Sequence, residues 1–153
     1  TDPQLLGTLI DRLGSYGPRI EIEILESAFM LELDRIESSM ARLKALGFSF
    51  LLDDFGTGFS SLSLLSRIKV DGIKLDRSIL ENANELKGRI LYRQTCYLCR
   101  SLGFNLIAEG VETAEQADFV KASGVQYVQG WLYAKALPAA QAKAFSRSRK
   151  PSS

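Results

Sequence analysis

The chain of 153 residues contains no histidine. This absence excludes catalytic triads built on imidazole, histidine phosphorelays and histidine-bound zinc hydrolase sites. Strong charge of one sign is also missing, because 19 Lys and Arg face 18 Asp and Glu, for a net charge of +1. Nucleic-acid polymers and anionic membrane surfaces are therefore not expected partners. The chemistry that remains is that of carboxylates, lysines and amides.

The chain has two cysteines, Cys96 and Cys99, which stand one helical turn apart. A CxxC pair could be a redox motif or half of a metal site, but without a second pair it is typical of two buried small side chains. Two thiols without a disulfide framework fit a reducing compartment. Apolar runs near the roughly 20 residues of a membrane span, and a secretory leader, are also missing. We expect a cytoplasmic location, with upstream segments of a parent protein free to tether it to a membrane.

Short apolar segments alternate with longer amphipathic ones along the chain, which is the pattern of strands and helices in turn. The expected strands are Arg19–Ile24, Phe48–Leu52, Val70–Leu75, Phe104–Ala108 and Val125–Val128. The expected helices cover residues 3–15, 31–46, 60–68, 84–102, 113–123 and 138–147. Gly47, Gly103 and Gly124 each stand between a helix and a strand, as helix-ending glycines do.

These elements predict an α/β fold built as a (βα) repeat, with about five parallel strands and flanking helices. We place one domain over residues 1–145. The basic, serine-rich residues 146–153 have no apolar anchor, and we expect a disordered tail there.

Polar side chains follow most of the expected strands. In chain order they are Glu23, Asp53, Asp54, Lys74, Asp76, Glu109 and Gln129. Ligand sites of α/β folds lie beyond the carboxyl ends of parallel strands, so these groups are expected to converge on one pocket. The alternative is that acidic residues simply end strands and begin turns.

Asp53 and Asp54 are adjacent carboxylates that would repel each other unless a cation lay between them. With only oxygen ligands at hand, that cation would be Mg²⁺ or Mn²⁺. Together with Glu23 and Glu109 they offer enough carboxylates for two ions about 3.5–4 Å apart, the arrangement used to attack phosphodiesters. Lys74 could activate the attacking water, neutralise developing charge, or form a structural salt bridge.

Five ordered segments of the chain resemble the EAL-domain cyclic-di-GMP phosphodiesterases of bacteria. The segments are Glu23–Ser27, Asp53–Leu62, Val70–Ser78, Ala108–Thr113 and Tyr127–Leu132. The resemblance covers nearly all of residues 1–138. It implies a modified TIM barrel and the metal-dependent hydrolysis of cyclic-di-GMP to linear pGpG.

The resemblance also implies roles for individual residues. Glu23, Asp53 and Asp54 match metal ligands, with Asp53 in the place that bridges two ions. Lys74 matches the lysine that activates or orients the attacking water. Glu109 matches an acid at the metal site, and we assign it both metal-binding and catalytic roles.

Outside the metal ligands, Gln129 matches an amide near the catalytic centre, and Glu26 matches an acid that steadies the loop Phe55–Ser61. In the family this loop couples catalysis to dimerisation, so a homodimer is expected. We assign Asp76 and Phe55 to substrate binding. Upstream sensory or GGDEF domains are common beside this family.

The chain is shorter than the roughly 250 residues of a TIM barrel, and it lacks the family's Glu-Ala-Leu motif and Asn ligand. We interpret it as the C-terminal part of an EAL domain, an incomplete barrel that would be weakly active or inactive by itself. The alternative function is a noncatalytic cyclic-di-GMP receptor or a protein-interaction module.

Overall fold

The computed structural model describes residues 3–57 and 62–148. Its centre is one parallel sheet of five strands in the order β1-β2-β3-β4-β5. The strands are β1 (Glu21–Leu25), β2 (Ser49–Phe55), β3 (Gly72–Leu75), β4 (Asn105–Ala108) and β5 (Tyr127–Val128). Strand order follows chain order, as in a TIM barrel, and the described strands leave β1 and β5 at the two edges. The expected incomplete (βα) barrel is confirmed.

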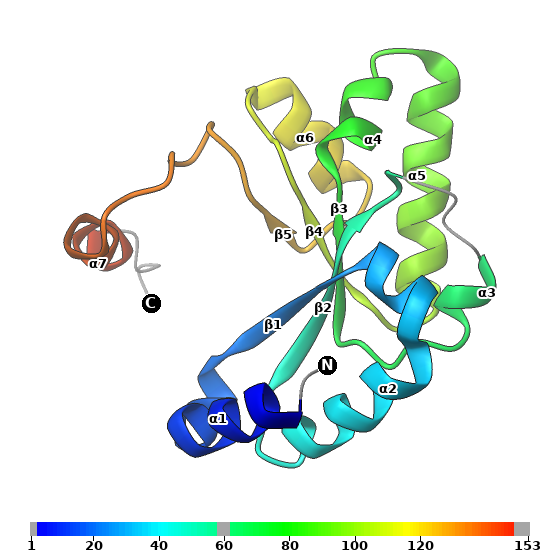
Figure 1. Cartoon of the computed structure of the whole chain (residues 1–153). Helices are drawn as coiled ribbons and strands as arrows, with labels where there is room; N and C mark the ends of the chain where they lie inside the picture. Colours follow the sequence, from blue (N-terminus) through cyan, green and yellow to red (C-terminus); the bar gives the residue numbers. More distant parts are fainter. Residues whose placement is uncertain (1–2, 58–61, 149–153) are drawn as a thin grey trace.

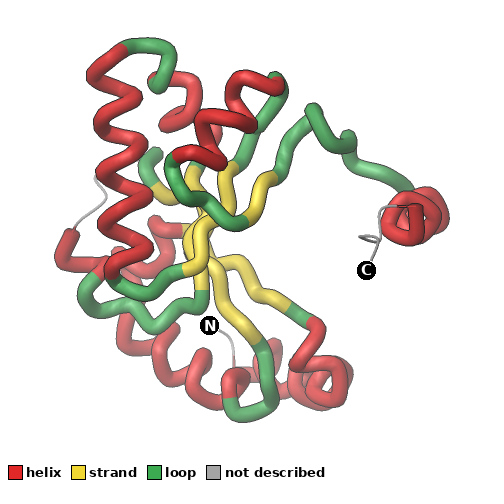
Figure 2. The backbone as a smooth tube through the Cα atoms, turned by 180° about the vertical axis from the view of Figure 1, so that it is seen from behind, coloured by secondary structure: helices red, strands yellow, loops and turns green. Residues whose placement is uncertain are grey.

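Helices connect the strands and lie against one face of the sheet (Figures 1 and 2). The helices are α1 (Pro3–Leu13), α2 (Glu26–Lys44), α3 (Leu62–Leu65), α4 (Arg77–Asn82), α5 (Leu86–Ser101), α6 (Ala114–Ala122) and α7 (Ala139–Ser148), with a 3-10 helix η1 (Gly14–Arg19) after α1. Helix α7 stands away from the sheet at the end of a long connection (Figure 1).

The hydrophobic core fills the space between the sheet and its covering helices. Successive side chains of a strand point to opposite faces, so every second residue of β2, β3 and β4 enters this core. They are Phe50, Leu52, Ile73, Leu75, Leu106 and Ala108. Helices α2, α5 and α6 contribute Phe29, Met40, Tyr92, Cys96, Cys99, Phe119 and Val120. The other face of the sheet is therefore left free to carry polar side chains.

Three helices end at the glycines expected from the sequence. Gly47, Gly103 and Gly124 follow α2, α5 and α6 with φ angles of 88°, 91° and 82°. After Gly103, the amide of Phe104 donates to the Cys99 carbonyl, which is the bond of a Schellman motif. Each glycine thus turns a helix directly into the next strand.

Several elements differ from the expected ones. Helix α2 begins at Glu26 instead of residue 31, because it consists of two helical pieces joined at a kink at Glu32, and the apolar pattern revealed only the second. Helix α4 was not expected, and its six residues are too few for a clear period. Helix α7 ends at Ser148, one residue beyond the expected helix over 138–147, so it includes the first three residues of the expected tail. Residues 149–153 lie outside the described ones.

The two cysteines are core residues, as expected. Cys96 and Cys99 are free thiols with no exposed surface. Burial raises the pKa of Cys96 to about 12 and that of Cys99 to about 11, so both thiols are neutral and unreactive at neutral pH. In the part of the chain that the structure describes, no helix has the length and apolarity needed to cross a membrane.

The hydroxyl of Tyr92 is fully buried and has no hydrogen-bond partner among the described residues. An unpaired buried hydroxyl costs about 1–3 kcal/mol, so Tyr92→Phe should raise the free energy of unfolding by about 1 kcal/mol in urea denaturation. Tyr97→Phe is the matched control on the same helix, since Tyr97 is 70% exposed, and should change stability by less than about 0.5 kcal/mol. A loss of stability in Tyr92→Phe would contradict this account.

Candidate functional site

The site begins with an irregularity at the end of β2. Leu52 pairs with Ile73 and Phe55 pairs with Leu75, so three steps along β2 match two along β3. The extra residue forms a bulge in which Asp54 has a φ of 57°, a left-handed conformation that Asp tolerates better than most residues. Strict alternation would send successive side chains to opposite faces. The bulge instead brings the carboxylates of Asp53 and Asp54 to the same edge.

Four strands meet at the ammonium group of Lys74 in β3. Its Nζ lies 2.8 Å from Asp53 Oδ1, 2.8 Å from Glu109 Oε1 and 3.0 Å from Glu23 Oε1. The three carboxylates come from β1, from β2 and from the residue after β4, and all lie on the face opposite the helices. The expected convergence of Glu23, Asp53, Lys74 and Glu109 is what the structure has.

The environment of Lys74 keeps it charged. Burial alone would lower its pKa, but the hydrogen bonds to Asp53, Glu109 and Glu23 outweigh burial and raise the pKa above its ordinary value. Lys74 is therefore an ammonium at neutral pH, although only 5% of the residue is exposed. In this arrangement it donates hydrogen bonds to the three carboxylates and supplies positive charge.

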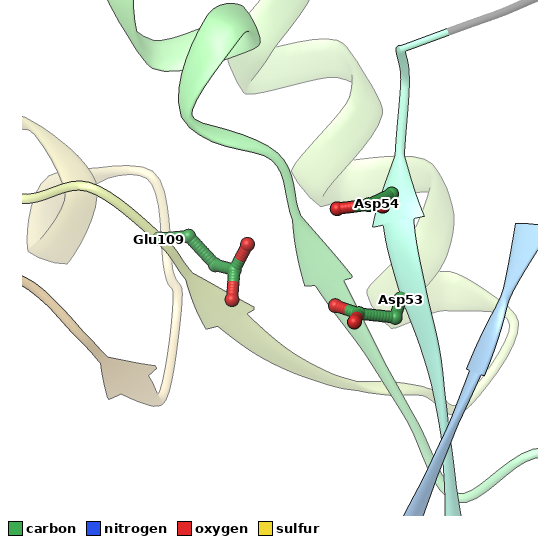
Figure 3. Close-up of side chains that lie close together, drawn as sticks. All are labelled: Asp53, Asp54 and Glu109. Atoms are coloured by element: carbon green, nitrogen blue, oxygen red, sulfur yellow. The ribbon is translucent and has the colours of Figure 1, made fainter.

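Three carboxylates lie close enough to share a cation. One oxygen each of Asp53, Asp54 and Glu109 lies within 4.8 Å of the others. Figure 3 shows the two β2 side chains pointing across β3 toward Glu109. The Oδ1 of Asp53 is buried, and apart from the Lys74 contact it accepts no hydrogen bond from the described residues. Carboxylate oxygens gathered this closely fit a hard cation such as Mg²⁺ or Mn²⁺.

Two further expected residues lie beside this cluster. Glu26 is buried, and its Oε2 accepts a hydrogen bond from the backbone N–H of Gly56 at 3.3 Å, at the start of the segment it was expected to steady. Residues 58–61 of that segment lie outside the described ones. Gln129 lines a groove of about 540 Å³ together with Glu109.

The two residues assigned to substrate binding are not brought to the groove. Phe55 is 5% exposed and belongs to the hydrophobic core, because the bulge before it returns its side chain to the helix-covered face. The carboxylate of Asp76 accepts a hydrogen bond from Ser78 N at 2.8 Å and caps α4. Neither side chain supports the expected contact with substrate.

The groove also contains residues that sequence reasoning missed. Arg77, Glu112 and Trp131 line it beside Glu109 and Gln129. Arg77 and Glu112 are ion-paired across 35 positions of sequence, and no local pattern links them. The signal that could have found them is their place directly after Asp76 and Val111, in the connections that follow β3 and β4.

A protein-family model described as the EAL domain matches residues 1–136. The chain belongs to the EAL domain family. The cyclic di-GMP phosphodiesterase NbdA of Pseudomonas aeruginosa is 35% identical over 140 residues, which are 91% of this chain and 18% of that protein. The chain spans between 17% and 26% of the length of four curated relatives that it matches.

Solved EAL structures have the same fold. The EAL domain of Mycobacterium smegmatis DcpA superposes with a TM-score of 0.87 at 28% identity, over 99% of this chain and 70% of that one. A complex of Klebsiella pneumoniae BlrP1 with manganese and cyclic-di-GMP superposes with a TM-score of 0.78 at 30% identity, over 87% of this chain and 35% of that one. The fold of this EAL chain is thus TIM-barrel-like.

Replacing Lys74 tests the shared ion pair. Lys74→Met leaves Glu23, Asp53 and Glu109 without a common countercharge, so the free energy of unfolding in urea should fall by about 2–3 kcal/mol, between the values for exposed and buried pairs. Lys44→Met removes an equally short but more exposed pair with Asp71, and should cost less than about 1 kcal/mol. Equal losses of stability in the two variants would show that the ion pairs of Lys74 stabilise the fold no more than one exposed pair does.

Proposed function

We propose that this EAL domain belongs to a metal-dependent phosphodiesterase that hydrolyses cyclic-di-GMP to linear pGpG. The observation that carries the proposal is the gathering of Glu23, Asp53 and Glu109 around Lys74 at the carboxyl edge of the sheet, with Asp54 close to Asp53 and Glu109. Relatives named as cyclic-di-GMP phosphodiesterases support the substrate.

Asp53, Asp54 and Glu109, with Glu23 beside them, would hold two Mg²⁺ or Mn²⁺ ions. Bound at such a site, divalent ions activate water and stabilise charge on phosphoryl oxygens. Solved complexes of a relative with manganese and with calcium support a divalent ion. The carboxylates of this chain would hold the ions, and the strands that carry them keep the carboxylates in place.

Lys74 acts through its fixed positive charge. Negative charge builds up on the phosphoryl oxygens as the water oxygen bonds to phosphorus and the bond to the 3′ oxygen breaks, and an ammonium donor stabilises that charge. Glu109 is the carboxylate beside Lys74 on the groove side, and we assign it the proton released by the water. The leaving 3′ oxygen takes up a proton from solvent, and Glu109 returns its proton to solvent, so that the reaction balances. Gln129 helps to orient the phosphodiester.

We further propose that the domain works in the cytoplasm as a homodimer, with the loop Phe55–Ser61 coupling dimerisation to the site through Glu26. The hydrogen bond from Gly56 to Glu26 supports the coupling, because Glu26 directly follows β1, the strand that carries Glu23. A relative described as a bifunctional diguanylate cyclase and phosphodiesterase supports an upstream GGDEF domain.

The decisive experiment measures pGpG released from cyclic-di-GMP by the natural protein that carries this chain, with Mn²⁺ or Mg²⁺ and after EDTA. Loss of a group that hydrogen-bonds a metal ligand lowers metal affinity or activity roughly 10–100-fold. Loss of a ligand itself in Asp53→Asn should therefore lower kcat/KM by at least roughly 100-fold. EDTA should abolish release, and added Mn²⁺ should restore it.

Asp118→Asn is the matched control, because Asp118 is an exposed aspartate on α6 and should leave the rate unchanged. Cyclic-di-GMP binding without pGpG release at any metal concentration would reject the phosphodiesterase and establish the noncatalytic receptor instead.

A further inference from the structure

We infer that Arg77 is a positioning residue that holds the segment 109–112, and with it Glu109, in the geometry the metal site needs. The inference rests on the proposed function in one respect, namely that Glu109 is a metal ligand. Arg77 is the first residue of α4, in the connection after β3, and residues 109–112 follow β4. Arg77 therefore links the ends of the two strands that bring Lys74 and Glu109 together.

The guanidinium of Arg77 contacts two acidic residues in different elements. Its Nη1 donates to Glu112 Oε1 at 2.9 Å, across the groove, and its Nε donates to Glu81 Oε1 within α4. A planar guanidinium presents several donors in a fixed fork, so it can hold two carboxylates at once. The contact with Glu81 stays within α4, whereas the contact with Glu112 fixes the segment after β4.

The stem of Arg77 makes a second contact with the same segment. Gly110 has a φ of 66°, and a Cβ at this position would lie 2.6 Å from Arg77 Cγ and 2.7 Å from Arg77 Cβ. Only a residue without a side chain lets the arginine stem approach the backbone here. Arg77 thus contacts the segment at Gly110 and at Glu112, the first and third residues after Glu109.

The opposite side of the segment is held by the chain after β5. Val111 N donates to the Gln129 carbonyl at 3.2 Å, and Leu132 N donates to the Val111 carbonyl at 3.1 Å. These bonds fix the backbone at Val111, whereas Arg77 fixes the residues on either side of it. The N–H of Glu109 donates to the Leu75 carbonyl at 3.1 Å, and Arg77 holds the residues that follow, so a shift of the segment would turn Glu109 about this anchor.

The Arg77–Glu112 pair is poorly placed to stabilise the fold. Its side chains are 51% and 35% exposed, and exposed pairs add at most about 1 kcal/mol to stability. The consequence of losing it should therefore appear at the metal site. Because Arg77 also lines the groove, direct contact with substrate is the competing explanation, and the test must separate the two.

The test compares Arg77→Met with Glu112→Gln, the double variant and the control Glu81→Gln in the natural protein. Calorimetric titration with Mn²⁺ alone should show binding weakened roughly 10-fold in both single variants, as for other groups that orient a metal ligand. The double variant should be no weaker than either single one, because both remove the same contact. Glu81→Gln breaks only the pair within α4 and should bind Mn²⁺ as wild type does.

Kinetics and hydrogen exchange complete the test. In Arg77→Met, kcat should fall with KM changed less than about twofold, and the amides of residues 109–112 should exchange faster. A raised KM with unchanged Mn²⁺ affinity would overturn the inference in favour of substrate contact. If the variants bind Mn²⁺ as tightly as wild type does, and the wild-type protein releases pGpG, only the inference about Arg77 is overturned. If the variants bind Mn²⁺ more weakly, but the wild-type protein releases no pGpG, only the proposed function is overturned.

Discussion

The structure depends on one ammonium group shared by carboxylates from three other strands. A buried lysine is costly unless its charge is matched, and Lys74 is matched by Glu23, Asp53 and Glu109. Without a cation in their midst, these acids would repel one another and push the ends of β1, β2 and β4 apart. The ammonium is therefore what allows an acidic cluster to exist at the edge of this sheet, and the cluster is what any metal chemistry requires.

The sheet divides the work of the molecule between its two faces. The helix-covered face holds nearly all of the large buried side chains and supplies the hydrophobic stabilisation. The opposite face carries the charged groups at its carboxyl edge. This separation means that changes among the charged groups need not disturb the core. The bulge at Asp54 serves both faces of the sheet, because it adds a second carboxylate to the polar face and still returns Phe55 to the core.

Local sequence chemistry was enough to predict most of the fold and the heart of the site. Alternating apolar residues indicated the strands, glycines marked the helix ends, and the rule that ligand sites lie at the carboxyl ends of parallel strands brought the acids together. The same rules could not reveal the bulge, because alternation alone gives no sign that Asp54 takes a left-handed conformation. The assignment of Phe55 to substrate binding did not foresee that the bulge returns this side chain to the core. The partner of Arg77 was missed because pairs far apart in sequence leave no local pattern.

The ligands of the cluster are held in two different ways. Asp53 pairs with Leu25 of β1, and Asp54 stands in the bulge between the paired residues Leu52 and Phe55, so β2 holds both positions. Glu109 lies beyond the last paired residue of β4; its N–H donates to the Leu75 carbonyl at 3.1 Å, and its further support comes from the segment after it. A strand cannot be adjusted without cost to the core, whereas in the segment after β4 only Val111 belongs to the core. Differences in metal affinity between members of such a fold should therefore arise on the Glu109 side, where substitutions change the geometry of the site and leave the folded sheet intact.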